Sequence, residues 1–426
     1  MMTKENPIYT TYVEILKNEL IPAMGCTEPI ALAYCAAKAK SVLGRLPEEI
    51  TVKASGNIIK NVKSVKVPHT GGMTGMEAAA AIGVWAGNAE VGLEVLSDIK
   101  DEAVKELPKY LEQTTITVLP LESNFLLDMI VTVKAGDDIA SVQISKEHTN
   151  ITKIMKNGST LFEKVELEEQ AHPLDYSLLS IDNIYEFATS VDIADVHEVI
   201  TRQIDYNLRI ANEGLKNSYG ANIGSTLMNC CPNDVRTRAK AMAAAGSDAR
   251  MSGCELPVVI CSGSGNQGLT TSLPVLEYAK ELGVSEEVTC RALVISNLVT
   301  LRVKNEIGRL SAYCGAVCAG AGAGAGIAYL RGDSYKDIIH TVVNALAITS
   351  GIICDGAKAS CAAKIAAAVD AGILGFEMYQ QGNQFYAGDG IVSDGIENTI
   401  RNVGILGRDG MKETDKEIIR IMTGCR

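Results

Sequence analysis

The pattern of hydrophobic and polar positions changes twice along the chain. Near the start, apolar residues at helical spacing predict one helix from Ile8 to Leu20 and a second from Thr27 to Lys40. Between residues 50 and 162, short β-branched runs separated by Gly and Asp turns predict strands, with helices at 75–85 and 91–107. The expected strands cover residues 50–52, 62–67, 115–118, 129–133 and 139–144. From Ile181 onward, helical spacing continues to the C-terminus.

This order of elements predicts an α+β fold, in which a large helix-rich domain carries an inserted, smaller α/β domain. We expect the N-terminal helices to pack back onto the C-terminal ones, so the helix-rich domain takes residues 1–48 and 181–426 and the insertion takes residues 49–180. Aromatic residues make up only 5% of the chain, whereas glycine contributes 39 residues. Small residues let helix backbones approach closely, which favours a tightly packed helical core.

Composition excludes some classes of partner. The chain has 39 Lys and Arg against 51 Asp and Glu, a net charge of −12, which argues against binding to nucleic acid or to an anionic membrane surface. Residues 311–330 carry no charge and are long enough to span a membrane, but Gly and Ala dominate them, so we expect a buried helix. The first twenty residues lack the apolar run of a signal peptide, which predicts a cytoplasmic protein without a membrane partner.

Twelve cysteines in a chain expected in the reducing cytoplasm indicate free thiols rather than disulfides. Cys314 and Cys318 are spaced C-x3-C, and Cys354 and Cys361 are spaced C-x6-C, without the paired C-x2-C units of a zinc ribbon. A thiolate-only site drawn from three of them suits an iron-sulfur cluster. Burial as small hydrophobic residues is the alternative for any cysteine.

Two further segments are candidate functional sites. Gly263–Gly268 reads Gly-Ser-Gly-Asn-Gln-Gly, which fits the dinucleotide fingerprint, but Pro274 and the helical spacing of residues 288–303 argue against that fold. A polar turn whose amides face an anionic ligand is the alternative. Cys26 precedes a predicted helix, where the dipole is expected to lower the pKa of a thiol, unless the residue only packs.

Seven short motifs occur in one order over nearly the whole chain: Gly25-Cys-Thr-Glu-Pro29, Ser55-Gly-Asn57 with Lys60-Asn61, Thr70-Gly-Gly-Met-Thr-Gly75, Tyr219-Gly-Ala-Asn-Ile-Gly224, Asp248-Ala-Arg-Met-Ser-Gly253, Gly263-Ser-Gly-Asn-Gln-Gly268 and Cys354-Asp-Gly-Ala-Lys358. Together they resemble the L-cysteine desulfidase family, which is related to the alpha chain of iron-sulfur L-serine dehydratase. The segment Gly308-Arg-Leu-Ser-Ala-Tyr-Cys314-Gly-Ala is similar to the G-E-V-G-x-A-C-S-M motif of that chain.

The resemblance implies an oxygen-sensitive [4Fe-4S] cluster held by Cys314, Cys354 and Cys361, with Cys318 left as a packing residue and no pyridoxal phosphate. The substrate sulfur would bind the open iron, while the Cys26 thiolate would take the α-proton. Loss of the proton and of sulfide gives aminoacrylate, which hydrolyses to pyruvate and ammonia. The expected activity is that of a lyase acting on L-cysteine, a small amino acid.

Several expectations follow for the substrate site and the assembly. We assign substrate binding to Thr27, Asn57, Asn266 and Gln267. Lys60 and Lys304 are candidate cationic partners, although a solvated surface lysine is the more usual role for a residue such as Lys60. In related dehydratases a C-terminal cysteine reaches the open iron; here Arg426 follows Cys425, so we expect a free tail. An Ala/Gly-rich surface favours a homodimer. L-Serine as substrate is one alternative, and a noncatalytic iron-sulfur sensor or scaffold is another.

Overall fold

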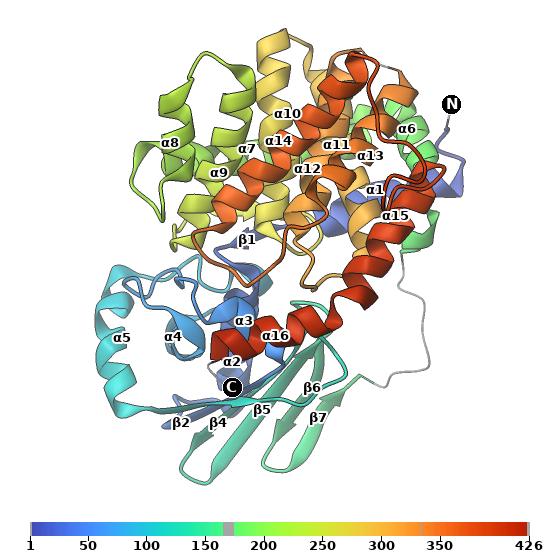
Figure 1. The fold of residues 1–426 in the computed structure, drawn as a ribbon. Coiled ribbons are helices and arrows are strands. Elements are labelled where there is room, and N and C mark those ends of the chain that lie inside the picture. Colours follow the sequence, from blue (N-terminus) through green and yellow to red (C-terminus); the bar gives the residue numbers. More distant parts are fainter. Residues whose placement is uncertain (1, 165–173, 333, 424–426) are drawn as a thin grey trace.

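The computed structural model describes residues 2–164, 174–332 and 334–423. Helices gather into one body, and a sheet lies at the other end of the molecule (Figure 1). This arrangement confirms the α+β class. The helical body consists of α1 (Pro7–Glu19), α6 (Ile181–Ser190), α7 (Ile193–Lys216), α8 (Ile223–Cys230), α9 (Val235–Met251), α10 (Gly265–Leu282), α11 (Glu286–Ile307), α12 (Gly315–Leu330), α13 (Tyr335–Thr349), α14 (Cys361–Gln380) and α15 (Ile396–Ile405).

The sheet has six strands in the order β3-β2-β4-β5-β6-β7. Its neighbours are antiparallel except for β2 and β3, which are parallel. Alternate residues of β4, such as Val131 and Val133, are buried, as expected of strands with one covered face. The strands are β2 (Glu49–Ala54), β3 (Thr115–Pro120), β4 (Asp128–Ala135), β5 (Asp138–Ser145), β6 (Ile151–Lys156) and β7 (Ser159–Glu163).

Two predicted elements of this region are wrong. Of the strand expected at 62–67, Val62 ends a helix, α3 (Gly56–Val62), residues 63–65 form a turn, and Lys66 makes only an isolated antiparallel bridge with Thr74. Val62, Val65 and Val67 are nevertheless all buried, so the apolar positions of this segment indicated burial and not a strand. The helix expected at 91–107 begins later, as α5 (Asp101–Gln113), after a single 3-10 turn, η1 (Gly92–Glu94).

The N-terminal helices divide between the two parts of the molecule. α1 packs on α7, as expected, but α2 (Thr27–Leu43) lies against β4, β5 and α4 (Gly75–Ala86). The expectation that both helices pack on the helical body is therefore wrong for α2, whose nearly all-round apolar surface suits a place between two layers. A short antiparallel pair, β1 (Pro22–Met24) with β8 (Pro257–Val259), joins the start of the chain to the helical body.

α12 is the central helix of the body and contacts α10, α11, α13 and α14. A methyl group at Gly320 would collide with the Ala368 carbonyl of α14, and one at Gly322 with Thr300 of α11. Glycine is therefore required where these backbones touch. None of the helices in the described ranges is long and apolar enough to cross a membrane, and the uncharged segment forms a buried helix, as predicted.

The last described helix, α16 (Lys412–Thr423), leaves the helical body and lies beside α3 (Figure 1). It follows a π-helical turn, η3 (Leu406–Gly410). Asp415 of α16 bonds to two side chains of α3: Lys60 Nζ at 2.5 Å and Asn57 Nδ2 at 2.8 Å. This contact fastens the C-terminal helix to the part of the chain that carries the sheet.

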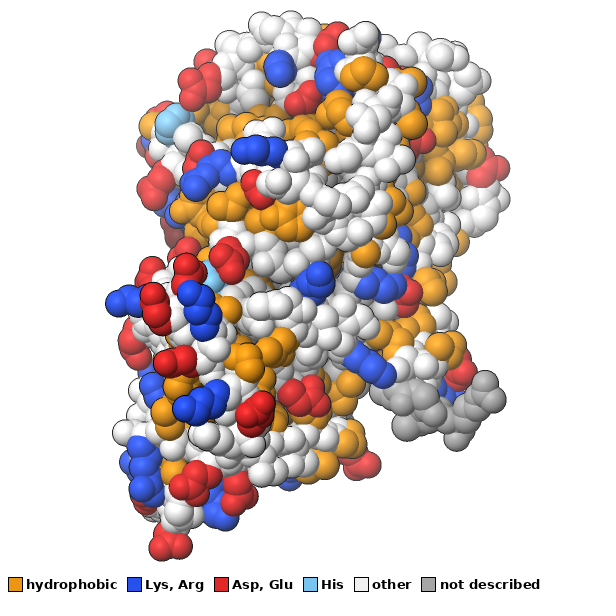
Figure 2. Space-filling model, turned by 90° about the vertical axis from the view of Figure 1, so that its left-hand side faces the viewer, with side chains coloured by type: hydrophobic (Ala, Val, Ile, Leu, Met, Phe, Trp, Pro, Cys, Tyr) orange, Lys and Arg blue, Asp and Glu red, His pale blue; other side chains and the backbone are white. Residues whose placement is uncertain are grey.

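The surface charge is mixed on the face drawn in Figure 2, where Lys and Arg side chains alternate with Asp and Glu. The pattern on this face differs from the single basic stripe that nucleic-acid binders present.

Candidate active site

A cavity of about 110 Å³ lies where α2, α3, α9 and α10 meet the loops that precede α12 and α14. Four helices begin at residues that line it, so their positive dipole ends favour bound negative charge. These residues are Cys26 before α2, Ser264 before α10, Cys314 before α12 and Cys361 at the start of α14.

The cavity brings together Cys314, Cys354 and Cys361. Backbone pairing fixes two of them side by side: Cys314 N donates to Ile352 O at 3.1 Å, and Cys354 N donates to Ala312 O at 2.6 Å. Cys361 follows on the first turn of α14. All three cysteine residues are partly buried.

Burial favours the neutral form of two of these thiols. Burial, then the proximity of Cys354, raises the pKa of Cys314 to about 12, and burial also raises the pKa of Cys361. No group of three or more His, Cys, Asp or Glu side chains in the described part of the chain could hold a single metal ion. A cubane cluster needs a different arrangement from a single ion, because each cysteine binds a different iron. Three thiols around one cavity therefore fit such a cluster.

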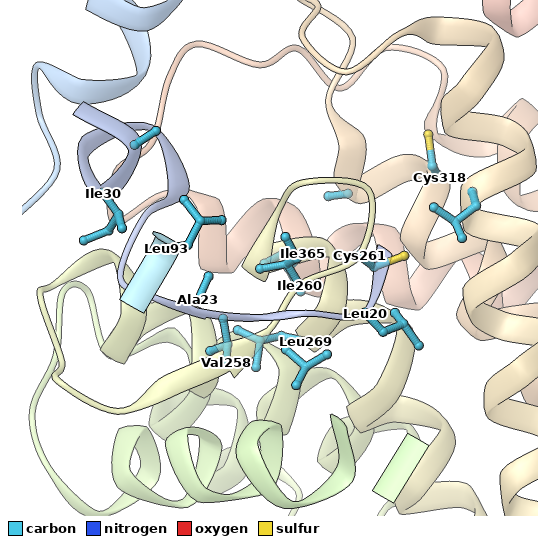
Figure 3. Close-up of a cluster of buried hydrophobic side chains, with 14 of the residues drawn as sticks. Leu20, Ala23, Ile30, Leu93, Val258, Ile260, Cys261, Leu269, Cys318 and Ile365 are labelled. Atoms are coloured by element: carbon cyan, nitrogen blue, oxygen red, sulfur yellow. The ribbon is translucent and has the colours of Figure 1, made fainter. Parts of the chain in front are cut away.

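Several other cysteines lie away from the cavity. Cys318 is fully buried in α12, and Figure 3 draws it and Cys261 in one cluster of buried apolar side chains. Cys230 is exposed at the end of α8, next to the exposed Cys231, and Cys290 is buried in α11. None of these lines the cavity. Cys425 lies outside the described residues.

Cys26 lines the cavity at the N-cap position of α2, but its electrostatic environment differs from the expected one. Its thiol is buried and donates to Glu28 Oε2 at 3.2 Å. Burial, reinforced by the Glu28 carboxylate, raises the pKa of Cys26 well above its usual value. The expected lowering of this pKa is therefore wrong, because desolvation and an adjacent negative charge outweigh the helix dipole.

The four predicted substrate-binding residues separate into two groups. Asn57, Asn266 and Gln267 line the cavity, and the Oδ1 of Asn57 and the Oε1 of Gln267 are buried with no partner among the described residues. Thr27 does not line it. The Thr27 hydroxyl lies 3.0 Å from Gly263 O and 3.1 Å from Glu28 Oε2, so it fixes the loop before α10 instead.

Both candidate lysines line the cavity, and neither is solvated. Lys60 is 2% exposed and paired with Asp415, so the surface role expected for it is wrong. The sequence could not reveal its partner, which lies 355 residues away. Lys304 is 3% exposed, and burial lowers its pKa although the nearby thiols Cys318, Cys354 and Cys314 oppose the shift.

Sequence reasoning assigned no role to several residues that line the cavity, among them Glu28, Asn61 and Arg250. Glu28 accepts from Asn61 Nδ2 at 3.1 Å. Burial alone would raise the pKa of Glu28, but nearby His148 and the Cys26 thiol lower it to about 2, so the carboxylate is charged. The only signal was that each of the three occurs inside a recognised motif.

The fold contradicts the dinucleotide interpretation of Gly263–Gly268. The strand before it, β8, belongs to a two-stranded antiparallel sheet, and residues 288–303 lie within α11. A dinucleotide site needs adjacent parallel strands at this point. The turn instead leads into α10 and places Asn266 and Gln267 at the cavity.

Comparisons with known proteins agree with this architecture. The family described as "Serine dehydratase alpha chain" matches residues 90–420. A UPF0597 protein of Desulfitobacterium hafniense is 56% identical over 422 residues, covering 99% of this chain and 98% of the relative. UPF0597 proteins of Lachnoclostridium phytofermentans (52% over 416 residues, 97% and 100%) and Vibrio parahaemolyticus (37% over 429 residues, 98% and 100%) are also similar. The chain belongs to the serine dehydratase alpha chain family.

Proposed function

We propose that this protein is an L-cysteine desulfidase, which eliminates sulfide from L-cysteine to give pyruvate and ammonia. One observation carries the proposal: the cavity gathers three thiols suited to a cluster and a fourth, Cys26, held by a carboxylate. The family match supports an iron-sulfur lyase of the dehydratase kind. Cysteine as the substrate rests on the motifs that resemble the desulfidases.

Cys314, Cys354 and Cys361 would hold a [4Fe-4S] cluster. When bound, the cluster supplies a Lewis acid for the leaving sulfur, which is a poor leaving group on its own. The helix starts around the cavity favour the negative charge of the thiolates. The proposal includes no pyridoxal phosphate: Cys26 would accept the α-proton, and a bound cluster would take up the negative charge of the leaving sulfur.

Cys26 is the proposed base. It must be a thiolate to accept the α-proton of the substrate at Sγ, and in the structure its own proton is directed at Glu28 Oε2. Glu28 therefore has two effects: it accepts the hydrogen bond that orients the thiol, and its charge opposes thiolate formation. Elimination breaks the Cα–H and Cβ–S bonds, and water then converts the aminoacrylate to pyruvate and ammonia.

The runner-up substrate is L-serine, which the description of the matched family favours. The two substrates differ in the atom that must leave, and a soft sulfur suits iron better than a hydroxyl does. A third class, a noncatalytic sensor or scaffold, would keep the cluster without turnover.

The experiment uses protein purified and reconstituted without oxygen. Iron and acid-labile sulfide are measured first, and then pyruvate, ammonia and released sulfide with L-cysteine and L-serine. We expect a higher kcat/KM for L-cysteine. A higher value for L-serine would transfer the assignment to a dehydratase, and a full cluster without turnover of either amino acid would indicate a sensor.

A further inference from the structure

Arg250, in the last turn of α9, is a buried cation that lines the cavity. Its side chain is 2% exposed, and its one hydrogen bond among the described residues runs from Nη1 to Asn266 Oδ1 at 3.0 Å. No ion pair between described residues includes it. Two other basic residues that line the cavity differ, because Lys60 is paired with Asp415 and Arg309 with Glu19.

The two remaining donor groups of Arg250, Nε and Nη2, are buried without a partner in the described part of the chain. They form one edge of the planar guanidinium, the edge that matches the two oxygens of a carboxylate. A buried charge with unsatisfied donors is costly, and a ligand that supplies two acceptor oxygens removes that cost.

Gly265, at the start of α10, keeps this guanidinium in place. A methyl group on Gly265 would collide with Arg250 Nε and lie 2.7 Å from Cζ, so only glycine allows the backbone to pack on the guanidinium. This requirement explains the second glycine of the Gly263–Gly268 motif without a dinucleotide.

The cavity also contains hydrogen-bond acceptors that lack a partner among the described residues. The Oδ1 of Asn57 and the Oε1 of Gln267 are buried acceptors with no partner among the described residues. A ligand with a carboxylate at one end and an ammonium at the other satisfies both kinds of orphan group. That chemistry is the backbone of an α-amino acid.

We propose that Arg250 binds the α-carboxylate of the amino-acid substrate through Nε and Nη2, and that Asn266 holds the guanidinium in position. The inference deepens the proposed lyase function and rests on it for the identity of the substrate. Carboxylate binding itself is measured independently of turnover. The rival role for Arg250 is to stabilise a Cys26 thiolate, since its charge opposes the rise in the pKa of Cys26.

The test measures binding of two thiol ligands to the cluster-loaded protein by calorimetry without oxygen. 3-Mercaptopropionate has a carboxylate and no amine, and cysteamine has an amine and no carboxylate. We expect R250Q to weaken binding of 3-mercaptopropionate about 10- to 100-fold, the usual range for hydrogen bonds to a charged group. Binding of cysteamine should change by less than about threefold, and R250K should fall between R250Q and the wild type.

R302Q is the matched control, because Arg302 is also buried and charged but pairs with Glu306 and Glu397 away from the cavity. It should leave both affinities unchanged. If R250Q does not fold, R250K and G265A are compared with the wild type instead. Their melting temperature and iron content show whether each variant is folded and loaded with the cluster. The proposal is overturned if these variants lose affinity equally for both ligands or bind 3-mercaptopropionate as the wild type does. It is also overturned if the wild type does not bind 3-mercaptopropionate. Failure of the lyase function alone would abolish turnover and leave this difference in binding intact.

Discussion

The contact between Cys26 and Glu28 gives the sharpest prediction about the chemistry. Glu28→Gln removes the negative charge and keeps an amide oxygen that can accept from the Cys26 thiol, which now lies 3.2 Å from Oε2. Because the carboxylate helps to raise the pKa of Cys26, its removal should lower that pKa. The thiolate then forms at lower pH.

The size of the effect follows from the separation. At an effective dielectric constant of about 20, two unit charges 3.2 Å apart interact by roughly 5 kcal/mol. Adjacent charges in proteins shift a pKa by about 1–3 units. Since thiolate is the active form of a base, kcat/KM should rise with pH through the pKa of Cys26. In E28Q the rise should occur about 1–3 pH units lower.

The assay is the pH profile of kcat/KM for sulfide release by the cluster-loaded enzyme. Glu277→Gln is the control, because Glu277 is also buried but pairs with Arg238 and does not line the cavity. Its profile should match the wild type. A rise that stays in place in E28Q, moves to higher pH, or moves equally in E277Q would refute the electrostatic role of Glu28.

The remaining predictions concern the cluster, the base and the packing. C354A should lose bound iron, whereas C318A should retain it, since only Cys354 lines the cavity; iron content and visible absorption decide this. C26A should keep the iron and lose sulfide release about 100-fold or more, the usual scale for a general base, and near-normal turnover would contradict this. D415N, which removes the partner of a buried lysine, should lower the free energy of unfolding in urea by about 3 kcal/mol or more; an unchanged value would mean that the pair contributes nothing. G320A should lower the free energy of unfolding by about 1–3 kcal/mol, because the added methyl group pushes α12 away from α14. The measurement is the melting temperature, which should fall; an unchanged melting temperature would show that the contact can relax.

Local patterns predicted much of the fold. The α+β class, the helices at both ends of the chain and the buried Ala/Gly helix followed from spacing and composition. The strand predicted at 62–67 was wrong because Val65 and Val67 are buried within a turn and beside an isolated bridge, and buried valines alone do not make a strand. α2 was placed on the wrong layer because an all-round apolar helix fits either side. The domain boundaries, the homodimer and the cytoplasmic location stay predictions.

The candidate site, like the fold, could be predicted from the sequence only in part. Motifs singled out Cys26, Asn57 and Asn266, and all three line the cavity. Partners that lie far along the chain could not be foreseen, as with Lys60 and Asp415. The pKa of Cys26 was misjudged because a helix start can be seen in a sequence, whereas burial cannot. Arg250 was inside a motif, but only its lack of partners in the fold gives it a role.

The most direct test of the central claim is a single measurement on reconstituted protein: the ratio of kcat/KM for L-cysteine to that for L-serine, with pyruvate as the common product. The proposed function predicts a ratio well above one, with sulfide released in equal amount to pyruvate when L-cysteine is the substrate. A ratio below one, or pyruvate formed from neither amino acid by protein that contains its full complement of iron, would contradict it.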